Sequence, residues 1–85
     1  DCPLTDIQCA LWHYWEEKHG AKIIGASHDV IEAYVANPPK TKDEAMALAW
    51  EQYIYCYDIV EQGVESVANL AGILMNGNYW YFWWD

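Results

Sequence analysis

The sequence predicts an α+β fold, in which a small antiparallel three-stranded sheet packs with about three helices in the order α-β-β-α-α-β. Apolar residues recur at helical spacing in three segments. Two short β-favouring runs are separated by a tight turn, and the chain ends in a run of aromatic residues, which favour strand. The 85 residues are enough for a single domain with one modest core.

The first helix is predicted over roughly residues 4–19, because apolar side chains recur there every three or four residues. Pro3 suits a first helical turn, and Gly20 suits the left-handed residue that ends a helix. Residues 21–27 and 30–35 then predict a hairpin that turns at His28-Asp29. The following Asn37-Pro38-Pro39 stops the second strand, because proline has no backbone N–H.

A second helix is predicted from the capping box Thr41-Lys42-Asp43-Glu44 to about Cys56. The side chains expected to face the core are Ala45, Leu48, Ala49, Gln52, Tyr53 and Cys56. A short turn from Asp58 to Gly63 follows. A third helix, which we expect to end at Asn76-Gly77, is marked by Val67, Leu70, Ala71 and Leu74.

The last strand is predicted at residues 79–84. Side chains alternate between the two faces of a strand, so Trp80, Phe82 and Trp84 should share one face. The other face should carry Tyr79, Tyr81 and Trp83, and the tyrosines, with their polar tips, suit the side open to water. Because an exposed aromatic edge would aggregate, we expect this strand to lie inside the sheet and to be covered.

The chain is strongly acidic, with four Lys, no Arg and thirteen Asp plus Glu, for a formal net charge of −9. Phosphate contacts need the positive charge that this chain lacks, so we expect no direct binding of nucleic acid. No stretch has the roughly 18 apolar residues of a membrane span, so we expect no membrane insertion. Residues 43–85 contain no basic side chain at all.

Such an acidic stretch either is a solvated surface that keeps the protein soluble or forms an interaction surface for a basic protein, because a negative field attracts a positive partner and speeds encounter. The expected partner-binding acids are Glu51, Asp58, Glu61 and Glu65, and the expected partner-binding aromatics are Tyr79, Tyr81 and Trp83. The leading hypothesis is a small acidic protein–protein interaction module, such as an inhibitor or immunity-type partner. The alternative is a ligand-binding or enzymatic domain with an aromatic pocket formed by the C-terminal strand and Cys56.

No catalytic residue, metal ligand or cofactor is predicted. His13 and His19 are six residues apart, or about 240° around a helix, so they do not share a face with Glu16 as a metal site would require. Cys56 lies near Asp58, but neither a strained turn nor a base accompanies it, so we interpret it as a small core residue.

Three cysteines, at positions 2, 9 and 56, cannot all pair within one chain, so we expect reduced thiols and a cytoplasmic protein. The start at Asp1, without an initiating Met or a basic region, is not typical of a signal peptide. It favours a domain excised from a longer protein. The sequence leaves the oligomeric state open.

Several strings of residues resemble one known family. They are Trp15-x-x-x-x-Gly20-Ala21, Pro38-Pro39-x-Thr41, Glu44-Ala45 leading to Cys56-x-Asp58, and the ending Trp80-x-Phe82-Trp83-Trp84-Asp85. Over residues 11–85 the chain resembles the bacterial domain of unknown function 4253 family, and the ending is the most specific part. The resemblance implies a bacterial origin and a place as the C-terminal part of a longer protein, but no particular activity or catalytic residue. The strong acidity and the lack of Arg depart from the family pattern.

Overall fold

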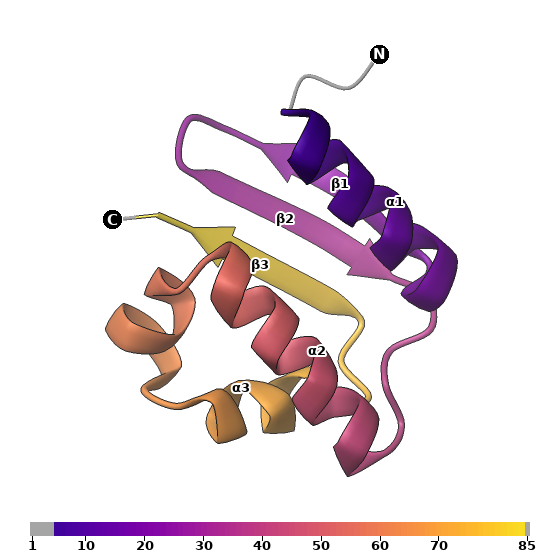
Figure 1. The fold of residues 1–85 in the computed structure, drawn as a ribbon, viewed down its shortest axis with the longest axis vertical. Helices are drawn as coiled ribbons and strands as arrows, with labels where there is room; N and C mark the ends of the chain where they lie inside the picture. Colours follow the sequence, from indigo (N-terminus) through magenta and orange to yellow (C-terminus); the bar gives the residue numbers. More distant parts are fainter. Residues whose placement is uncertain (1–4, 85) are drawn as a thin grey trace.

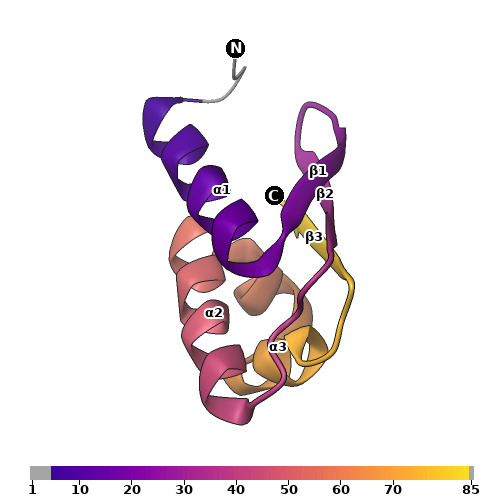
Figure 2. The same cartoon turned by 90° about the vertical axis from the view of Figure 1, so that its right-hand side faces the viewer.

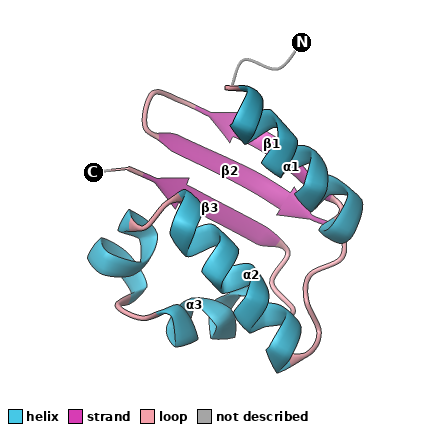
Figure 3. Ribbon diagram, in the orientation of Figure 1, coloured by secondary structure: helices cyan, strands magenta, loops and turns pink. Residues whose placement is uncertain are grey.

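The computed structural model describes residues 5–84 (Figure 1). In chain order the elements are α1 (Asp6–His19), β1 (Ala21–Ala26), β2 (Val30–Val35), α2 (Lys42–Tyr55), the π-helical turn η1 (Val60–Val64), α3 (Val67–Leu74) and β3 (Tyr79–Trp83). Helices and strands therefore follow one another as predicted, and the fold class is α+β (Figure 3).

The strands form one antiparallel sheet in the order β1-β2-β3, with β2 in the centre. Figure 2 shows α1 and α2 on the same side of this sheet, with no helix on its opposite face among residues 5–84. The sheet thus has an inner face that packs on helices and an outer face that is open.

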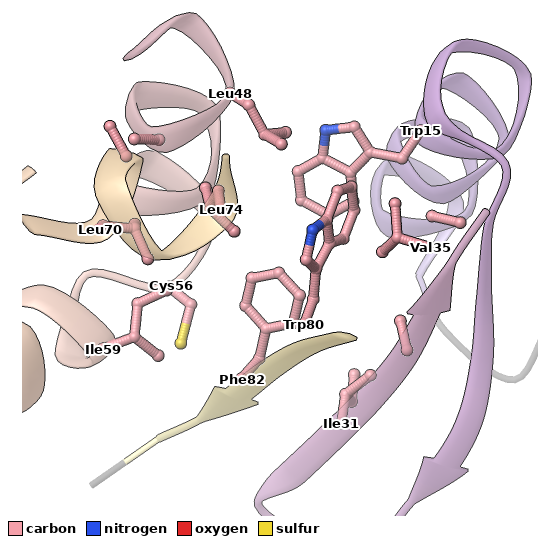
Figure 4. Close-up of a cluster of buried hydrophobic side chains, with 14 of the residues drawn as sticks. Trp15, Ile31, Val35, Leu48, Cys56, Ile59, Leu70, Leu74, Trp80 and Phe82 are labelled. Atoms are coloured by element: carbon pink, nitrogen blue, oxygen red, sulfur yellow. The ribbon is translucent and has the colours of Figure 1, made fainter. Parts of the chain in front are cut away.

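The core lies between the inner face and the helices (Figure 4). Ile31 pairs with Phe82 and Ala33 pairs with Trp80, and all four side chains are buried. From α1, the fully buried Trp15 stacks on Phe82 with a centroid distance of 5.7 Å. Aromatic rings supply a large part of the apolar area that stabilises so small a domain.

The ends of α1 and α2 follow local rules. The Thr5 hydroxyl caps α1 by accepting the N–H of Gln8, and Gly20 ends that helix with φ 65°. This helix begins at Asp6 and not at residue 4. Pro3, which was predicted to suit its first turn, lies outside the described residues. At α2 the Thr41 hydroxyl accepts the N–H of Glu44 and donates to the Glu44 carboxylate at 3.1 Å, so the predicted residues Thr41 and Glu44 cap this helix.

Three other features differ from the prediction or add detail to it. The predicted short turn after α2 is the π-helical η1, which ends at Glu65 with φ 78°. The aromatic strand β3 pairs with β2 of the hairpin, as expected, but within residues 5–84 it forms an edge of the sheet and does not lie inside it. Between α3 and β3, a Cβ on Gly77 would lie 2.6 Å from the carbonyl oxygen of Ile73, so this connection requires glycine.

Within residues 5–84, no helix combines the length and the apolar character needed to cross a bilayer.

Candidate functional site

The outer face of β3 exposes aromatic side chains in the alternation that the sequence predicted. Tyr79 is 67% exposed and Tyr81 is 55% exposed, whereas Trp83 is half-buried. Tyr79 contacts the ring of Tyr34 on β2 with a centroid distance of 5.5 Å, and Tyr81 is paired with the exposed Glu32. Because no helix within the described residues covers this face, the tyrosine rings lie at the surface, where large flat side chains often anchor protein interfaces.

The turn η1 lies directly beside β3. A Cβ on Gly63 would lie 3.5 Å from the ring of Trp83, so the η1 backbone packs against that ring. Glu61 belongs to η1, Glu65 caps its end, and Asp58 lies just before it. The structure therefore brings two of the predicted groups to one region, which we call the β3–η1 surface and define by Asp58, Glu61, Glu65, Tyr79, Tyr81 and Trp83.

The acids of this surface differ in their surroundings. Glu61 is exposed and accepts a hydrogen bond of 2.6 Å from the hydroxyl of Tyr53, which raises the pKa of that hydroxyl. Glu65 is also exposed, and Asp58 is half-buried. A hydrogen bond from a neutral hydroxyl leaves the negative charge of Glu61 in place, so the acids remain able to attract a cation.

Glu51, the fourth acid of the prediction, lies elsewhere. Its carboxylate accepts hydrogen bonds from the indole N–H of Trp15 at 3.0 Å and from the hydroxyl of Tyr14 at 3.4 Å, both on α1. Tyr53, which holds Glu61, is two residues away on α2 and therefore about 200° around the helix. Glu51 ties α1 to α2 and is not part of the β3–η1 surface.

A small cavity of about 230 Å³ lies between β3 and the helical elements. Tyr79, Tyr81 and Trp83 line it, as does Leu74 of α3. Two fully buried polar residues, Gln52 and Trp80, also line it. Sequence reasoning did not identify Gln52 as a site residue, although its signal was present as a polar side chain within the core-facing stripe of α2.

Cys56 is a buried free thiol that does not line this cavity. Its sulfur donates a hydrogen bond of 3.0 Å to the backbone carbonyl of Trp83, and burial raises the pKa of the thiol. A raised pKa disfavours the thiolate, which is the nucleophilic form. The geometry thus agrees with a packing role that joins the end of α2 to β3.

Cys9 is not a reduced thiol but is disulfide-bonded, so that part of the cysteine prediction is wrong. An odd number of cysteines prevents all three from pairing within one chain, but it does not prevent one of them from forming a disulfide. Cys2 itself lies outside the described residues.

The histidines of α1 have unlike surroundings. His13 is exposed, whereas His19 is buried against Trp80, and burial lowers the pKa of the His19 imidazole. Among the residues that the structure describes, no group of three His, Cys, Asp or Glu side chains has the geometry to hold a metal ion.

The model of a domain of unknown function (DUF4253) matches residues 1–85, which is the whole chain. Searches of curated proteins and of solved structures found no significant match.

Proposed function

The chain belongs to the DUF4253 family, and we propose that it is an interaction module whose β3–η1 surface binds a protein with a basic surface. The observation that carries this proposal is the arrangement of Tyr79, Tyr81 and Trp83 beside the acids of η1 on a sheet face that no described helix covers. An inhibitor or immunity-type role is the form of this function that the acidity supports best.

The proposal follows from how protein interfaces distribute their energy. A few central aromatic residues usually supply most of the affinity, because they bury large rigid areas at little cost in conformational entropy. Charged residues at the rim act mainly on the rate of encounter. On the β3–η1 surface, Tyr79 and Tyr81 suit the first role, whereas Glu61 and Glu65 suit the second.

The sign of the charge specifies the partner. The protein carries a formal charge of −9, and no Lys or Arg occurs in residues 43–85, which include nearly all of α2 and the whole of η1, α3 and β3. The salt-bridged Lys22 belongs to β1, on the far side of the sheet from β3. An acidic partner would therefore be repelled, and a basic one attracted.

The compartment in which the partner is met is part of the proposal. The expectation of a cytoplasmic protein rested on reduced cysteines, but disulfides persist mainly in oxidising compartments. The disulfide at Cys9 therefore favours a partner met outside the reducing cytoplasm. Alkylation without reductant, followed by peptide mapping, should label Cys56 after denaturation and leave Cys9 unlabelled.

The experiment is an affinity measurement with single variants. A partner recovered by affinity capture is produced alone, and its binding is compared for the parent protein, Tyr81→Ser and Ile54→Ser. Ile54 is 80% exposed on α2 and serves as the matched control, because it is also a surface apolar residue but is outside the β3–η1 surface. We expect a loss of about tenfold or more for Tyr81→Ser and no change for Ile54→Ser. Equal affinity for both variants would refute the proposal.

The enzymatic alternative is not supported at Cys56, since its thiol is buried, hydrogen-bonded and disfavoured as a thiolate. The ligand-binding alternative keeps support from the cavity behind β3, but through Gln52 and Trp80.

A further inference from the structure

The cavity behind β3 contains two buried hydrogen-bond donors that have no acceptor. The side-chain Nε2 of Gln52 and the indole Nε1 of Trp80 are both shielded from water, and neither has a hydrogen-bond partner within the described part of the chain. Both residues are 98% buried, since each is 2% exposed, and both line this one cavity. In Figure 4 the nitrogen of Trp80 lies on the side of the ring that faces Leu70 and Leu74, away from Val35.

The other buried indoles show what is unusual here. Trp12 donates its N–H to the hydroxyl of Tyr55 at 3.2 Å, and Trp15 donates to the carboxylate of Glu51 at 3.0 Å. The indole N–H groups of these two tryptophans on α1 therefore both have hydrogen-bond acceptors, and in each case the acceptor comes from α2. Buried polar groups in folded proteins are almost always hydrogen-bonded, and an unsatisfied one costs free energy. Two such groups at one cavity suggest that something else supplies the acceptor.

We propose that this cavity binds a small neutral molecule that presents a carbonyl-type oxygen to the buried donors of Gln52 and Trp80. An oxygen of this kind has two lone pairs and can accept from both residues. Binding would then give both donors an acceptor, and only a ligand with an acceptor could do so.

Charge and size restrict the ligand further. The cavity lies against η1, whose neighbourhood carries Asp58, Glu61 and Glu65 and no basic residue, so a carboxylate or phosphate group is disfavoured relative to an uncharged amide, lactam or ketone. The volume of about 230 Å³ is below the roughly 300–1,000 Å³ typical of pockets for drug-sized ligands. Most of the other lining residues are apolar, Leu70, Leu74 and Trp83 among them, which suits an apolar body with a single carbonyl group.

Access to the cavity is provided beside exposed residues of β3. Tyr79 and Tyr81 line the cavity and are also exposed, so the cavity reaches the surface beside them. This site goes beyond the proposed protein interface, because its recognition elements are the buried donors and not the exposed rings or the acids. A failure of ligand binding would leave partner binding untouched, and the two experiments have separate readouts.

The test is an NMR titration of the isotope-labelled protein with benzamide as the probe. The six tryptophans give indole N–H signals, and the signal of Trp80 is assigned by its loss in Trp80→Phe. We expect the Trp80 indole proton and the Gln52 side-chain amide protons to shift downfield and to saturate, because a new acceptor deshields them. The indole signals of Trp12 and Trp15, which already have acceptors, should stay in place and serve as internal controls.

Toluene is the matched probe, because it has the same ring without a carbonyl. It should bind at least tenfold more weakly than benzamide and should cause no downfield shift at Trp80. The variant Gln52→Leu keeps the approximate size of the side chain and removes the donor, so it should weaken benzamide at least tenfold while its urea midpoint stays equal or rises.

Several results would overturn the proposal. One is the absence of a saturable shift at Trp80 in the parent protein. Another is equal binding of toluene and benzamide, which would make the cavity a merely apolar one. A third is an upfield move of the Trp80 indole proton in ligand-free Gln52→Leu, since that would mean that Gln52 itself supplies the acceptor.

Discussion

Phe82 and Tyr81 are adjacent in the chain but point to opposite faces of β3. Phe82 is fully buried and contacts the rings of Trp12, Trp15 and Tyr55 at centroid distances of 5.3–5.7 Å. Tyr81 is 55% exposed on the outer face. Alternation along the strand therefore assigns one residue to the core and the next to the surface.

We expect Phe82→Ala to cost about 3–5 kcal/mol of unfolding free energy, because it removes a large buried ring and leaves a cavity. Tyr81→Ala should cost about 1 kcal/mol or less, since little of its contact area is lost from the core. Urea denaturation followed by tryptophan fluorescence measures both. If Phe82→Ala unfolds at the same midpoint as the parent protein, β3 does not belong to the core.

His19 gives the stability of α1 a pH dependence. Burial lowers the pKa of the folded imidazole below its ordinary value of 6.5, so the unfolded chain binds the proton more readily than the folded one. The stabilisation due to the neutral imidazole is complete above pH 6.5 and is lost as the pH falls below it.

The measurement is the unfolding free energy of the parent protein and of His19→Gln between about pH 5 and pH 8. We expect the parent protein to lose stability relative to His19→Gln as the pH falls through this range. His13→Gln, at an exposed position of the same helix, should follow the parent curve. Parallel curves for the parent protein and His19→Gln would contradict the assignment.

At the scale of elements, the link between α3 and β3 depends on a close approach of the backbone. A Cβ at Gly77 would lie 2.6 Å from the carbonyl oxygen of Ile73, whereas a Cβ at Gly72, inside α3, would meet nothing within 4 Å. Gly77→Ala should therefore destabilise the fold by about 1 kcal/mol or more. Gly72→Ala should stabilise it by roughly 0.5–1 kcal/mol, because alanine favours a helix. Thermal unfolding shows whether the two substitutions change the stability in opposite directions. A stabilising Gly77→Ala would contradict the close approach at this link.

Most elements were predictable because their signals are local. The hydroxyl of Thr41 and the left-handed Gly20 act within one turn of the helices that they bound, and the two faces of β3 follow from alternation alone. The edge position of β3 and the open outer face were not predictable, because they depend on which elements pack on which side. The missing acceptors of Gln52 and Trp80 are likewise a property of distant segments brought together.

The candidate site was predicted in part for the same reason. Asp58, Glu61 and Glu65 lie close in sequence around one turn, so their proximity needed no knowledge of the fold. Glu51 has the same composition signal, but the indole of Trp15 on another helix turns its carboxylate toward α1. The composition was enough to identify the acidic residues. Only the tertiary structure shows that Glu51 joins α1 to α2 and does not belong to the β3–η1 surface.

At the scale of the whole molecule, the position of charge matters as well as its sum. We expect the joint reversal Asp58→Lys, Glu61→Lys and Glu65→Lys to slow association with a basic partner and to flatten the dependence of that rate on salt. The matched control is the reversal of three exposed acids outside the β3–η1 surface, Asp6→Lys, Glu17→Lys and Asp29→Lys, which gives the same net charge. Stopped-flow association rates at several salt concentrations compare the two. Equal slowing by both sets would mean that the bulk charge, and not this surface, steers the partner.

The irregular pairing of β1 has a consequence for how molecules of this protein meet one another. An open sheet edge is a template on which a second chain can add a strand and begin a fibril. Between Ile23 and Gly25 the register of β1 against β2 shifts, and the exposed Lys22 lies at the same edge. A bulge twists the strand away from a flat template, and a lysine there would have to lose its hydration on contact. The hairpin side of the sheet is therefore a poorer template for fibril growth than a regular, flat edge would be.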